Sequence, residues 1–539
     1  MKIAVITDDL NNLANWQMRI LQHLLVSKEL ELSALITVQK TTCEHYHELK
    51  TPKNNLAKFF LKLQWSLERK FFFKKLKTIK ASQLSERLSQ VNKFEINENS
   101  TSNSKDIEQL KLHNLDLILK LEDTIHCKEL SGLAKHGTWS LKHNAKHITN
   151  HSPTGFWEIM NKEATVVVSL LKVSKTEAQP LLLDQAHFNK HWSLVKTTDM
   201  VLESSVALLT KNLKSVATLE PTEQASTKTQ TILAQPNALQ IVDYMLKFYT
   251  KVTTKILERL ASKILNWRYQ CFTLFIAKGQ FNTTDLSTLE PIKLPKDEFW
   301  ADPFLFDYKN ETYVFFENYP YSTKRGKISC GRLKNNQIVD VIDILDFDYH
   351  LSYPYVFEEN GEIYLMPESS ENKKLEIYKC THFPDQWELH STAFEGELIA
   401  DAFFFDDENN EKWLFLNKAA TTTVPLENEL YIYKVSSTDL LKKLIPHKQN
   451  PVLIDSRTAR NGGAIFSYKN KIYRPSQAND QGVYGRALNI NRITNLTLEE
   501  YSEETIETVE PDFYEGLMSV HHLHQTDDRF VIDAAYKRH

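Results

Sequence analysis

A hairpin pattern that recurs five times is the feature of this sequence that most constrains its fold. Each copy has an apolar strand, a turn marked by Asn, Gly or Asp, and a second strand that carries an aromatic residue. The copies begin about 50 to 60 residues apart, at 302–317, 353–368, 401–417, 462–477 and, less clearly, 519–534. Repeats of this length leave room for two more strands each, as in the blades of a β-propeller. The sequence therefore predicts an all-β five-bladed propeller over residues 267–539.

A further strand is expected before the first repeat, in RYQCFTLFIA (268–277). Such a strand can complete the last blade and close the ring, which removes an exposed sheet edge. We expect the first and last strands of this domain to pair.

The first part of the chain alternates strands with helices. KIAVITDD (2–9), LSALITV (32–38) and LDLILKL (115–121) are expected to be buried parallel strands of a Rossmann-like α/β domain over residues 1–215. The turn after the first strand lacks the G-x-G-x-x-G pattern, so the usual dinucleotide-binding fingerprint is missing. Residues 216–266 are predicted to be a linker followed by a helix.

Composition argues against several classes of function. The formal net charge of −4 argues against a general nucleic-acid binder, because neutralising phosphates needs a basic surface. The five cysteines show no C-x-x-C pairing, so neither a disulfide framework nor a metal site is predicted. The N-terminus lacks a signal-peptide core, and no window approaches the roughly 18 apolar residues of a membrane span. We therefore expect a cytoplasmic protein.

Residues 58–77 form a basic amphipathic segment, with six lysines and one arginine against a single glutamate. One interpretation is a helix that lies on an anionic membrane surface, at the inner face of the membrane. The other is an ordinary domain helix with a solvated basic face. The sequence leaves both interpretations open.

The repeats predict a cluster of acids and amides. A hairpin brings the start of its first strand beside the end of its second, and the first strands of a propeller line its axis. The residues expected at one mouth are Asp302, Tyr353, Asp401, Gly462 and Ser519, beside Glu317, Glu368, Asn417, Gln477 and Ala534. Gathered carboxylates raise one another's pKa, which suits acid–base chemistry at a sugar's anomeric carbon. The alternative is that each acid only satisfies backbone donors.

Aromatic and basic side chains near these positions are candidates for binding a sugar. Aromatic rings can stack on a sugar face, and arginines can pair with an acidic sugar or a phosphate. The stacking candidates also include Phe299 and Tyr355, and a further arginine candidate is Arg474. The histidines of VHHLH (520–524) are either structural or metal ligands, and no complementary acid cluster is evident in the sequence. The predicted substrate-binding set is Trp300, Glu317, Tyr353, Arg460, Gln477, Tyr484, Arg486 and His521.

Several of these motifs resemble a known family. The motifs are FWADPFLF (299–306), LSYPYVFEENGEIYLMPES (351–369), ADAFFF (400–405), YRPSQ (473–477) and YGRAL (484–488). They resemble the propeller module of plant glucosamine inositolphosphorylceramide transferases, which is similar to the propeller of family-43 glycoside hydrolases. The resemblance implies that the three catalytic acids of the hydrolases fall on Asp302, Glu368 and Asp401. A separate domain is thought to carry glycosyl transfer in the plant enzymes, which leaves an accessory role open for the propeller.

The first domain resembles the formyltransferase fold through LDLILKL and the segment 136–173. Formyltransferases place an Asn and a His at a strand end, with a later Asp before a Gly, and these groups manage a proton. Here Ser140 stands at the Asn position, Lys142 or His143 at the His position, and 175–183 lacks the Asp-Gly pair. The resemblance implies formyl-tetrahydrofolate as a cofactor, which these departures disfavour, although His143 remains a candidate base.

Three functions follow from these patterns. The first is glycosyl transfer in surface-polysaccharide or glycolipid biosynthesis, with a nucleotide sugar as donor and a sugar or glycan as partner. The second is N-formylation of a nucleotide-linked amino sugar. The third is a non-catalytic scaffold that binds glycans.

Overall fold

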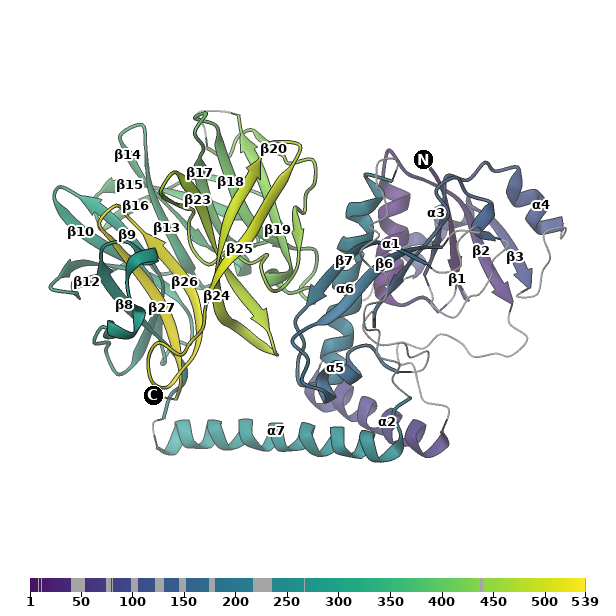
Figure 1. Cartoon of the computed structure of the whole chain (residues 1–539), viewed down its shortest axis with the longest axis horizontal. Helices are drawn as coiled ribbons and strands as arrows, with labels where there is room; N and C mark the ends of the chain where they lie inside the picture. Colours follow the sequence, from purple (N-terminus) through teal and green to yellow (C-terminus); the bar gives the residue numbers. More distant parts are fainter. Residues whose placement is uncertain are drawn as a thin grey trace. The chain divides into compact units, whose positions relative to one another are not determined.

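The computed structural model describes residues 1–7, 9–10, 12–39, 54–73, 79, 81–97, 105–121, 130–144, 152–173, 180–216, 235–265, 267–436 and 440–538. The chain forms two compact units, Met1–Val252 and Thr253–His539 (Figure 1). The linker predicted within 216–266 lies mostly outside the described residues. So do residues 175–179 of the segment that lacks an Asp-Gly pair, and most of the loop after His143.

The first unit is built on one seven-stranded sheet in the order β3-β2-β1-β4-β5-β6-β7. Its strands are β1 (Lys2–Thr7), β2 (Glu31–Gln39), β3 (Asn92–Asn97), β4 (Leu117–Lys120), β5 (Thr138–Lys142), β6 (Val166–Val173) and β7 (Leu181–Phe188). The neighbouring strands from β3 to β5 in this order pair parallel, as predicted, whereas β6 pairs antiparallel with both β5 and β7. The connection between β6 and β7 (174–180) is too short for a parallel crossover, which needs a dozen or more residues, so these two strands are antiparallel to each other. The sheet is therefore mixed rather than purely Rossmann-like.

Helices pack on this sheet and on one another. Those of the first unit are α1 (Asn15–Val26), α2 (Asn55–Leu67), α3 (Ala81–Ser89), α4 (Lys105–Lys111), α5 (Phe156–Met160) and α6 (Leu194–Leu213), and α7 (Ala238–Ile264) begins in it. Helix α2 continues into a π-helical turn, Glu68–Phe72. Helices α1 and α6 contact each other and the sheet (Figure 1).

A buried carboxylate fixes α2 against its neighbours. Glu68 follows α2 and accepts hydrogen bonds from the Tyr244 hydroxyl of α7 at 2.6 Å and from Gln64 Nε2 at 3.0 Å. The hydroxyl of Ser193, the N-cap residue of α6, also donates to Glu68. Ala57, Leu61, Tyr244 and Phe248 share one apolar cluster. These contacts determine which face of α2 is buried and which remains exposed.

The second unit consists of five sheets, so the predicted five-bladed propeller is confirmed. Its first three blades contain β9 (Glu298–Tyr308), β10 (Glu311–Pro320), β11 (Lys327–Lys334) and β12 (Gln337–Leu345); β13 (Ser352–Glu359), β14 (Glu362–Glu368), β15 (Leu375–His382) and β16 (Gln386–Ala393); and β17 (Leu398–Asp406), β18 (Lys412–Ala419), β19 (Glu429–Val435) and β20 (Leu444–Pro446), with β21 (Leu453–Ile454). The others contain β22 (Phe466–Tyr468), β23 (Lys471–Asp480), β24 (Val483–Leu496) and β25 (Tyr501–Val509); and β26 (Leu517–Gln525), β27 (Arg529–Arg538) and β8 (Tyr269–Lys278).

The propeller closes as the sequence predicts. Strand β8 pairs antiparallel with β27, the last strand of the chain, and Phe275 lies opposite Ile532. The first strands of neighbouring blades, such as β9 with β13 and β9 with β26, contact each other around the axis. Closure by the first and last strands thus gives the fifth blade its third strand.

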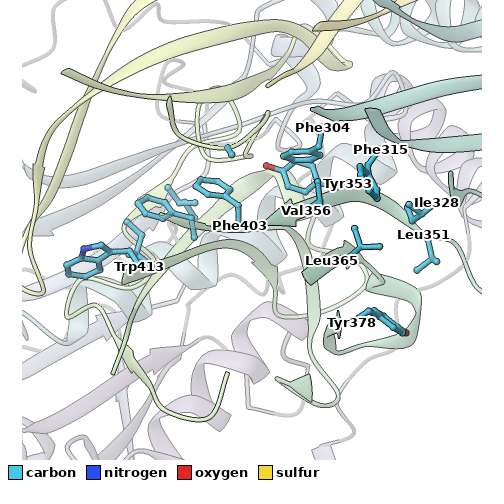
Figure 2. Close-up of a cluster of buried hydrophobic side chains, with 14 of the residues drawn as sticks. Phe304, Phe315, Ile328, Leu351, Tyr353, Val356, Leu365, Tyr378, Phe403 and Trp413 are labelled. Carbon is cyan, nitrogen blue, oxygen red and sulfur yellow. The ribbon is translucent and has the colours of Figure 1, made fainter. Parts of the chain in front are cut away.

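Neighbouring blades pack against each other through apolar side chains. Along each strand these side chains alternate with others that point to the opposite face of the sheet. Figure 2 shows part of this core, where Phe304 of β9, Tyr353 and Val356 of β13, and Phe403 of β17 gather. The ring of Phe403 stacks on that of Phe415, with centroids 5.2 Å apart. This packing holds the inner strands, and the residues on them, in fixed positions.

The first strand of the fourth blade, β22, is short, and before it Gly462 and Gly463 let the fifth blade approach closely. The Leu523 amide donates to the Gly462 carbonyl at 2.8 Å. A Cβ at Gly463, whose φ is +132°, would lie 1.8 Å from the Leu523 carbonyl oxygen. No side chain larger than hydrogen fits at this position.

We expect Gly463→Ala to lower the free energy of unfolding by about 3 kcal/mol, because overpacking adds to backbone strain. Urea unfolding followed by circular dichroism measures this change. The matched control is Gly396→Ala, which has a left-handed φ of +86° but meets nothing within 4 Å, and should cost about 1 kcal/mol. Equal losses in both variants would contradict the steric explanation.

Candidate active site

Three inner-strand residues at equivalent places adopt left-handed backbone conformations. These are Asp302 (φ 50°), Tyr353 (φ 47°) and Asp401 (φ 47°). Each lies at a register shift in the pairing of its hairpin. Bulges of this kind redirect a side chain at the cost of local strain, and they cluster at functional sites. Three blades therefore use one backbone device to aim a side chain.

The ends of the second strands lie beside these bulges, as the hairpin argument predicts. The paired residues in the first three blades are Ala301 with Glu317, Ser352 with Glu368, and Ala400 with Asn417. Burial raises the pKa of Glu317, and the nearby Asp302, Glu368, Asp533 and Asp401 raise it further. The acids of different blades thus converge, and their mutual repulsion favours the protonated form of Glu317.

Arg460 joins two of these acids. It comes from the segment between β21 and β22, and its Nη2 lies 3.0 Å from both Asp401 Oδ1 and Glu368 Oε2. Its Nε also donates to Asp401. Burial and neighbouring acids raise the pKa of Asp401, and Arg460 opposes that rise. One buried cation therefore compensates one of two buried carboxylates.

The fifth blade contributes a histidine and an acid beside Asp302. His521 Nδ1 lies 2.8 Å from Asp533 Oδ1, and Asp533 Oδ2 accepts from the Asp302 amide at 2.9 Å. Burial lowers the pKa of His521, but Asp533 and Asp302 outweigh this effect, so the pKa is raised. Burial also raises the pKa of Asp302 to about 6. The charge of Asp302 therefore changes near pH 6.

The prediction for the fifth blade is wrong by one or two residues. Ser519 and Ala534 were expected at the mouth, but His521 and Asp533 occupy these places. Two register shifts in the pairing of β26 with β27 offset the alternation there. We call the seven converging side chains the acidic mouth: Asp302, Glu317, Glu368, Asp401, Asp533, Arg460 and His521.

Metal-ligand atoms also meet in the acidic mouth. One ligand atom each from Asp302, His521 and Asp533 lie within 4.8 Å of one another. Two carboxylates and an imidazole are donors that divalent cations accept. The expectation that the VHHLH segment lacks complementary acids is therefore wrong, because Asp533 of the same blade and Asp302 of the neighbouring blade supply them.

His350, between β12 and β13, was not anticipated from the sequence. Its Nδ1 accepts from the Gly326 amide at 2.9 Å, which leaves the proton on Nε2. That Nε2 lies 3.5 Å from Glu317 Oε1. Burial lowers the pKa of His350, so this neutral ring faces the Glu317 carboxyl. No repeat contains His350, which is why repeat analysis could not find it.

Some predicted sugar-binding residues lie elsewhere. Trp300 is 3% exposed and donates to Glu298 Oε1 at 2.8 Å, while its ring packs on Phe316. The Tyr355 hydroxyl donates to the Phe404 carbonyl at 3.0 Å. Successive side chains of a strand point to opposite faces, so a residue next to a mouth position points into the core. Both rings are packed there. Neither ring offers a face to a sugar.

Others lie at the acidic mouth or support it. Tyr484 exposes 47% of its surface, and its ring edge faces His521 with centroids 6.0 Å apart. Gln477 is buried, and its backbone N–H donates to the Arg460 carbonyl at 2.9 Å. Arg486 instead pairs with Asp480 and Glu510.

Arg474 is completely buried and holds the segment that carries Arg460. Its Nη1 donates to Asn461 Oδ1 at 3.0 Å, and Asn461 Nδ2 donates to the Asp401 carbonyl at 2.8 Å. Its guanidinium also pairs with Glu503. Arg474 therefore has no free donor face for a ligand and acts as a structural support.

In the first unit, the residues predicted for formyl transfer lie on or after β5. Ser140 and Lys142 are on the strand, and Ser140 is buried. His143 is also buried, and its Nε2 lies 3.0 Å from Ser205 Oγ. Because the Ser205 hydroxyl donates to the Leu202 carbonyl, His143 Nε2 carries the proton of this bond. His143 can act as a base through Nε2 only if Nε2 gives up this proton and its hydrogen bond to Ser205.

Asp302 gives the acidic mouth a testable pH dependence. Its folded-state pKa of about 6 exceeds the ordinary value of 3.8, so between these values the folded state binds more protons than the unfolded state. Its contribution therefore lowers the free energy of unfolding as pH rises from about 4 to 6. Asn does not titrate, and it tolerates a left-handed φ.

We expect Asp302→Asn to be more stable than the wild type by about 2 kcal/mol at pH 7.5, with a smaller difference near pH 4. Urea unfolding at both pH values measures it. Asp527→Asn, at an exposed acid in the turn of the fifth blade, is the control and should show no such difference. Destabilisation of the Asp302 variant at pH 7.5 would contradict the assigned pKa direction.

Comparison with known proteins confirms the resemblance of the propeller. Residues 288–519 match the family model described as glucosamine inositolphosphorylceramide transferase 1, N-terminal. The protein of that name from Oryza sativa subsp. japonica is 36% identical over 209 residues, which are 38% of this chain and 27% of the relative. The one from Arabidopsis thaliana is 34% identical over 209 residues, with the same coverage. The chain thus spans 27% of the length of the curated relatives that it matches.

Solved structures similar to this chain include glycoside hydrolases. An endo-arabinase from Bacteroides thetaiotaomicron VPI-5482 has 15% identity and a TM-score of 0.32, covering 47% of this chain and 97% of that one. A thermostable family-43 glycoside hydrolase has 12% identity and a TM-score of 0.30, covering 44% of this chain and 89% of that one. The family model lies within the propeller, so it gives the formyltransferase resemblance of the first unit no support.

Proposed function

We propose that this protein is carbohydrate-active in glycolipid or surface-polysaccharide biosynthesis and takes part in glycosyl transfer, with its sugar site at the acidic mouth. The observation that carries this proposal is the convergence of five carboxylates with one arginine and one histidine. Acid–base pairs of this kind suit chemistry at an anomeric carbon. The match to relatives named as glucosamine inositolphosphorylceramide transferases supports the glycolipid context.

Within this proposal, Asp302 is the general base. A pKa of about 6 leaves it ionised at neutral pH and still basic enough to accept the proton of an acceptor hydroxyl. Glu317, whose pKa is raised by burial, carries a proton and donates to the leaving oxygen. The neutral His350 ring beside Glu317 avoids a charge that would ionise that carboxyl.

Arg460 binds the charged part of the ligand. Its Nε and Nη2 are used by Asp401 and Glu368, whereas Nη1 makes no hydrogen bond to the described residues. An Nη1 donor suits a phosphate oxygen of a nucleotide sugar or a sugar carboxylate. The exposed ring of Tyr484 beside His521 gives a surface for the sugar ring.

A second candidate is a propeller that binds glycans without catalysis. The specific observation in its favour is that Arg460 engages Glu368 and Asp401, two of the three acids that the family resemblance assigns to catalysis. Acids held by a guanidinium bind hydroxyl groups well but transfer protons poorly.

Turnover with a panel of nucleotide sugars and glycolipid or glycan acceptors tests the proposal. Glycosyl transfer requires nucleotide release that depends on both donor and acceptor, and it should be lost in Asp302→Asn. Glycan retention without turnover, weakened by Glu368→Gln, supports the scaffold instead. Neither binding nor turnover with any member of the panel would overturn both candidates.

A further inference from the structure

Helix α2 and the π-helical turn after it expose large apolar side chains although other residues of the same helix already fill the core. Phe59 is 59% exposed, Leu63 41% and Phe71 64%. Ala57 and Leu61, on the opposite face, pack against α7. Residue spacing places Phe59 and Leu63 on one stripe, because positions i and i+4 share a helix face. The exposed face of this segment therefore carries an apolar stripe of its own, separate from the apolar residues that pack into the core.

Basic side chains flank this apolar stripe. Lys58, Lys62 and Lys70 are exposed beside it. Glu68, the single acid between residues 54 and 73, is buried in the hydrogen bonds that hold α2 to α7. Among the described residues of this segment, the exposed charges are thus all positive. Exposed Phe and Leu among lysines are the features of a helix that lies on an anionic bilayer.

A second helix adds apolar area in the same unit. Helix α7 contacts α2 through Tyr244 and Phe248, and Phe72 of the π-helical turn meets the Phe248 ring edge with centroids 5.2 Å apart. Leu239 and Leu246, seven positions apart on α7, are both exposed. Seven residues make two helical turns, so these leucines share a face. These leucines lie on the side of α7 away from Tyr244 and Phe248, next to the exposed ion pair of Asp243 with Lys247, so they are separate from the apolar stripe of α2.

We propose that the surface formed by the exposed residues of 54–72 docks on an anionic phospholipid membrane. The apolar side chains enter the boundary between headgroups and acyl chains, and the lysines pair with lipid phosphates and carboxylates. Binding is peripheral, and no described helix has the length and apolar content needed to cross a bilayer. The Glu68 contacts keep the docking face outward, so no refolding is needed.

Co-sedimentation of the full chain with vesicles tests this docking. We expect binding to phosphatidylcholine vesicles that contain about 30% phosphatidylserine, little binding to pure phosphatidylcholine, and weakening as salt rises from about 0.1 to 0.5 M. Phe59→Ser/Leu63→Ser should reduce the partition coefficient about tenfold or more. Lys58→Glu/Lys62→Glu should reduce it about fivefold per lysine.

Controls separate docking from general effects. Leu389→Ser and Lys448→Glu change comparably exposed residues of the propeller and should bind vesicles like the wild type. Thermal unfolding confirms that all variants are folded. The proposal is overturned if the wild type ignores anionic vesicles, or if the α2 variants bind them as well as the controls do. It is also overturned if Phe59→Ser/Leu63→Ser instead abolishes self-association of a chain that binds no vesicles.

Discussion

Replacing Arg460 with methionine is expected to lower the free energy of unfolding by about 3 to 5 kcal/mol at neutral pH and to abolish ligand binding at the acidic mouth. The variant leaves Glu368 and Asp401 buried without their shared cation, and an uncompensated buried charge is costly. Urea unfolding measures the stability, and calorimetric titration measures the binding.

Two comparisons make the Arg460 prediction specific. Arg332→Met breaks an exposed pair with Glu311 and Asp340, so it should cost less than about 1 kcal/mol and leave binding intact. Lowering the pH should recover part of the Arg460 variant's stability, because the two carboxylates can then be protonated. A wild-type unfolding curve for Arg460→Met would contradict the assigned ion-pair cluster.

Asp302→Asn is expected to lower kcat/KM for glycosyl transfer by about a thousandfold while donor binding changes little. Removing a general base commonly costs 10² to 10⁴ in rate, and Asn keeps the size and backbone preference of Asp. In the wild type, kcat/KM should rise with pH to a plateau, with an apparent pKa near the value of about 6 for this carboxyl. Steady-state kinetics from about pH 5 to 8 measure both effects.

The same variant is expected to be more stable than the wild type, which separates loss of catalysis from loss of folding. Asp527→Asn should keep wild-type kinetics and pH dependence. Undiminished turnover in Asp302→Asn would remove Asp302 from the chemistry and favour glycan binding without catalysis.

Much of the propeller could be predicted because its repeats are local and its closure follows from geometry. The turn and aromatic positions in segments such as 302–317 identify each hairpin, and an unpaired strand at 268–277 fits the incomplete last blade. The reversed direction of β6 was missed, since three apolar strands near the N-terminus suggested a uniformly parallel sheet. Short connections decide strand direction more reliably than apolar character does.

The acidic mouth could be predicted where a hairpin alone sets the register. Asp302 with Glu317 follows from that rule. Asp533 and His350 do not, because one depends on register shifts in the last blade and the other lies in a connection outside every repeat. Left-handed φ values leave no clear trace in a sequence when the residue is Asp or Tyr rather than Gly. Tertiary contacts therefore determine the part of the site that was missed.

The measurement that tests the central claim most directly is calorimetric titration of the wild type, Arg460→Met and Arg332→Met with one panel of nucleotide sugars and glycans. We predict that at least one member binds the wild type and Arg332→Met with equal affinity and fails to bind Arg460→Met. No binding to the wild type, or equal binding to all three proteins, would contradict a sugar site at the acidic mouth.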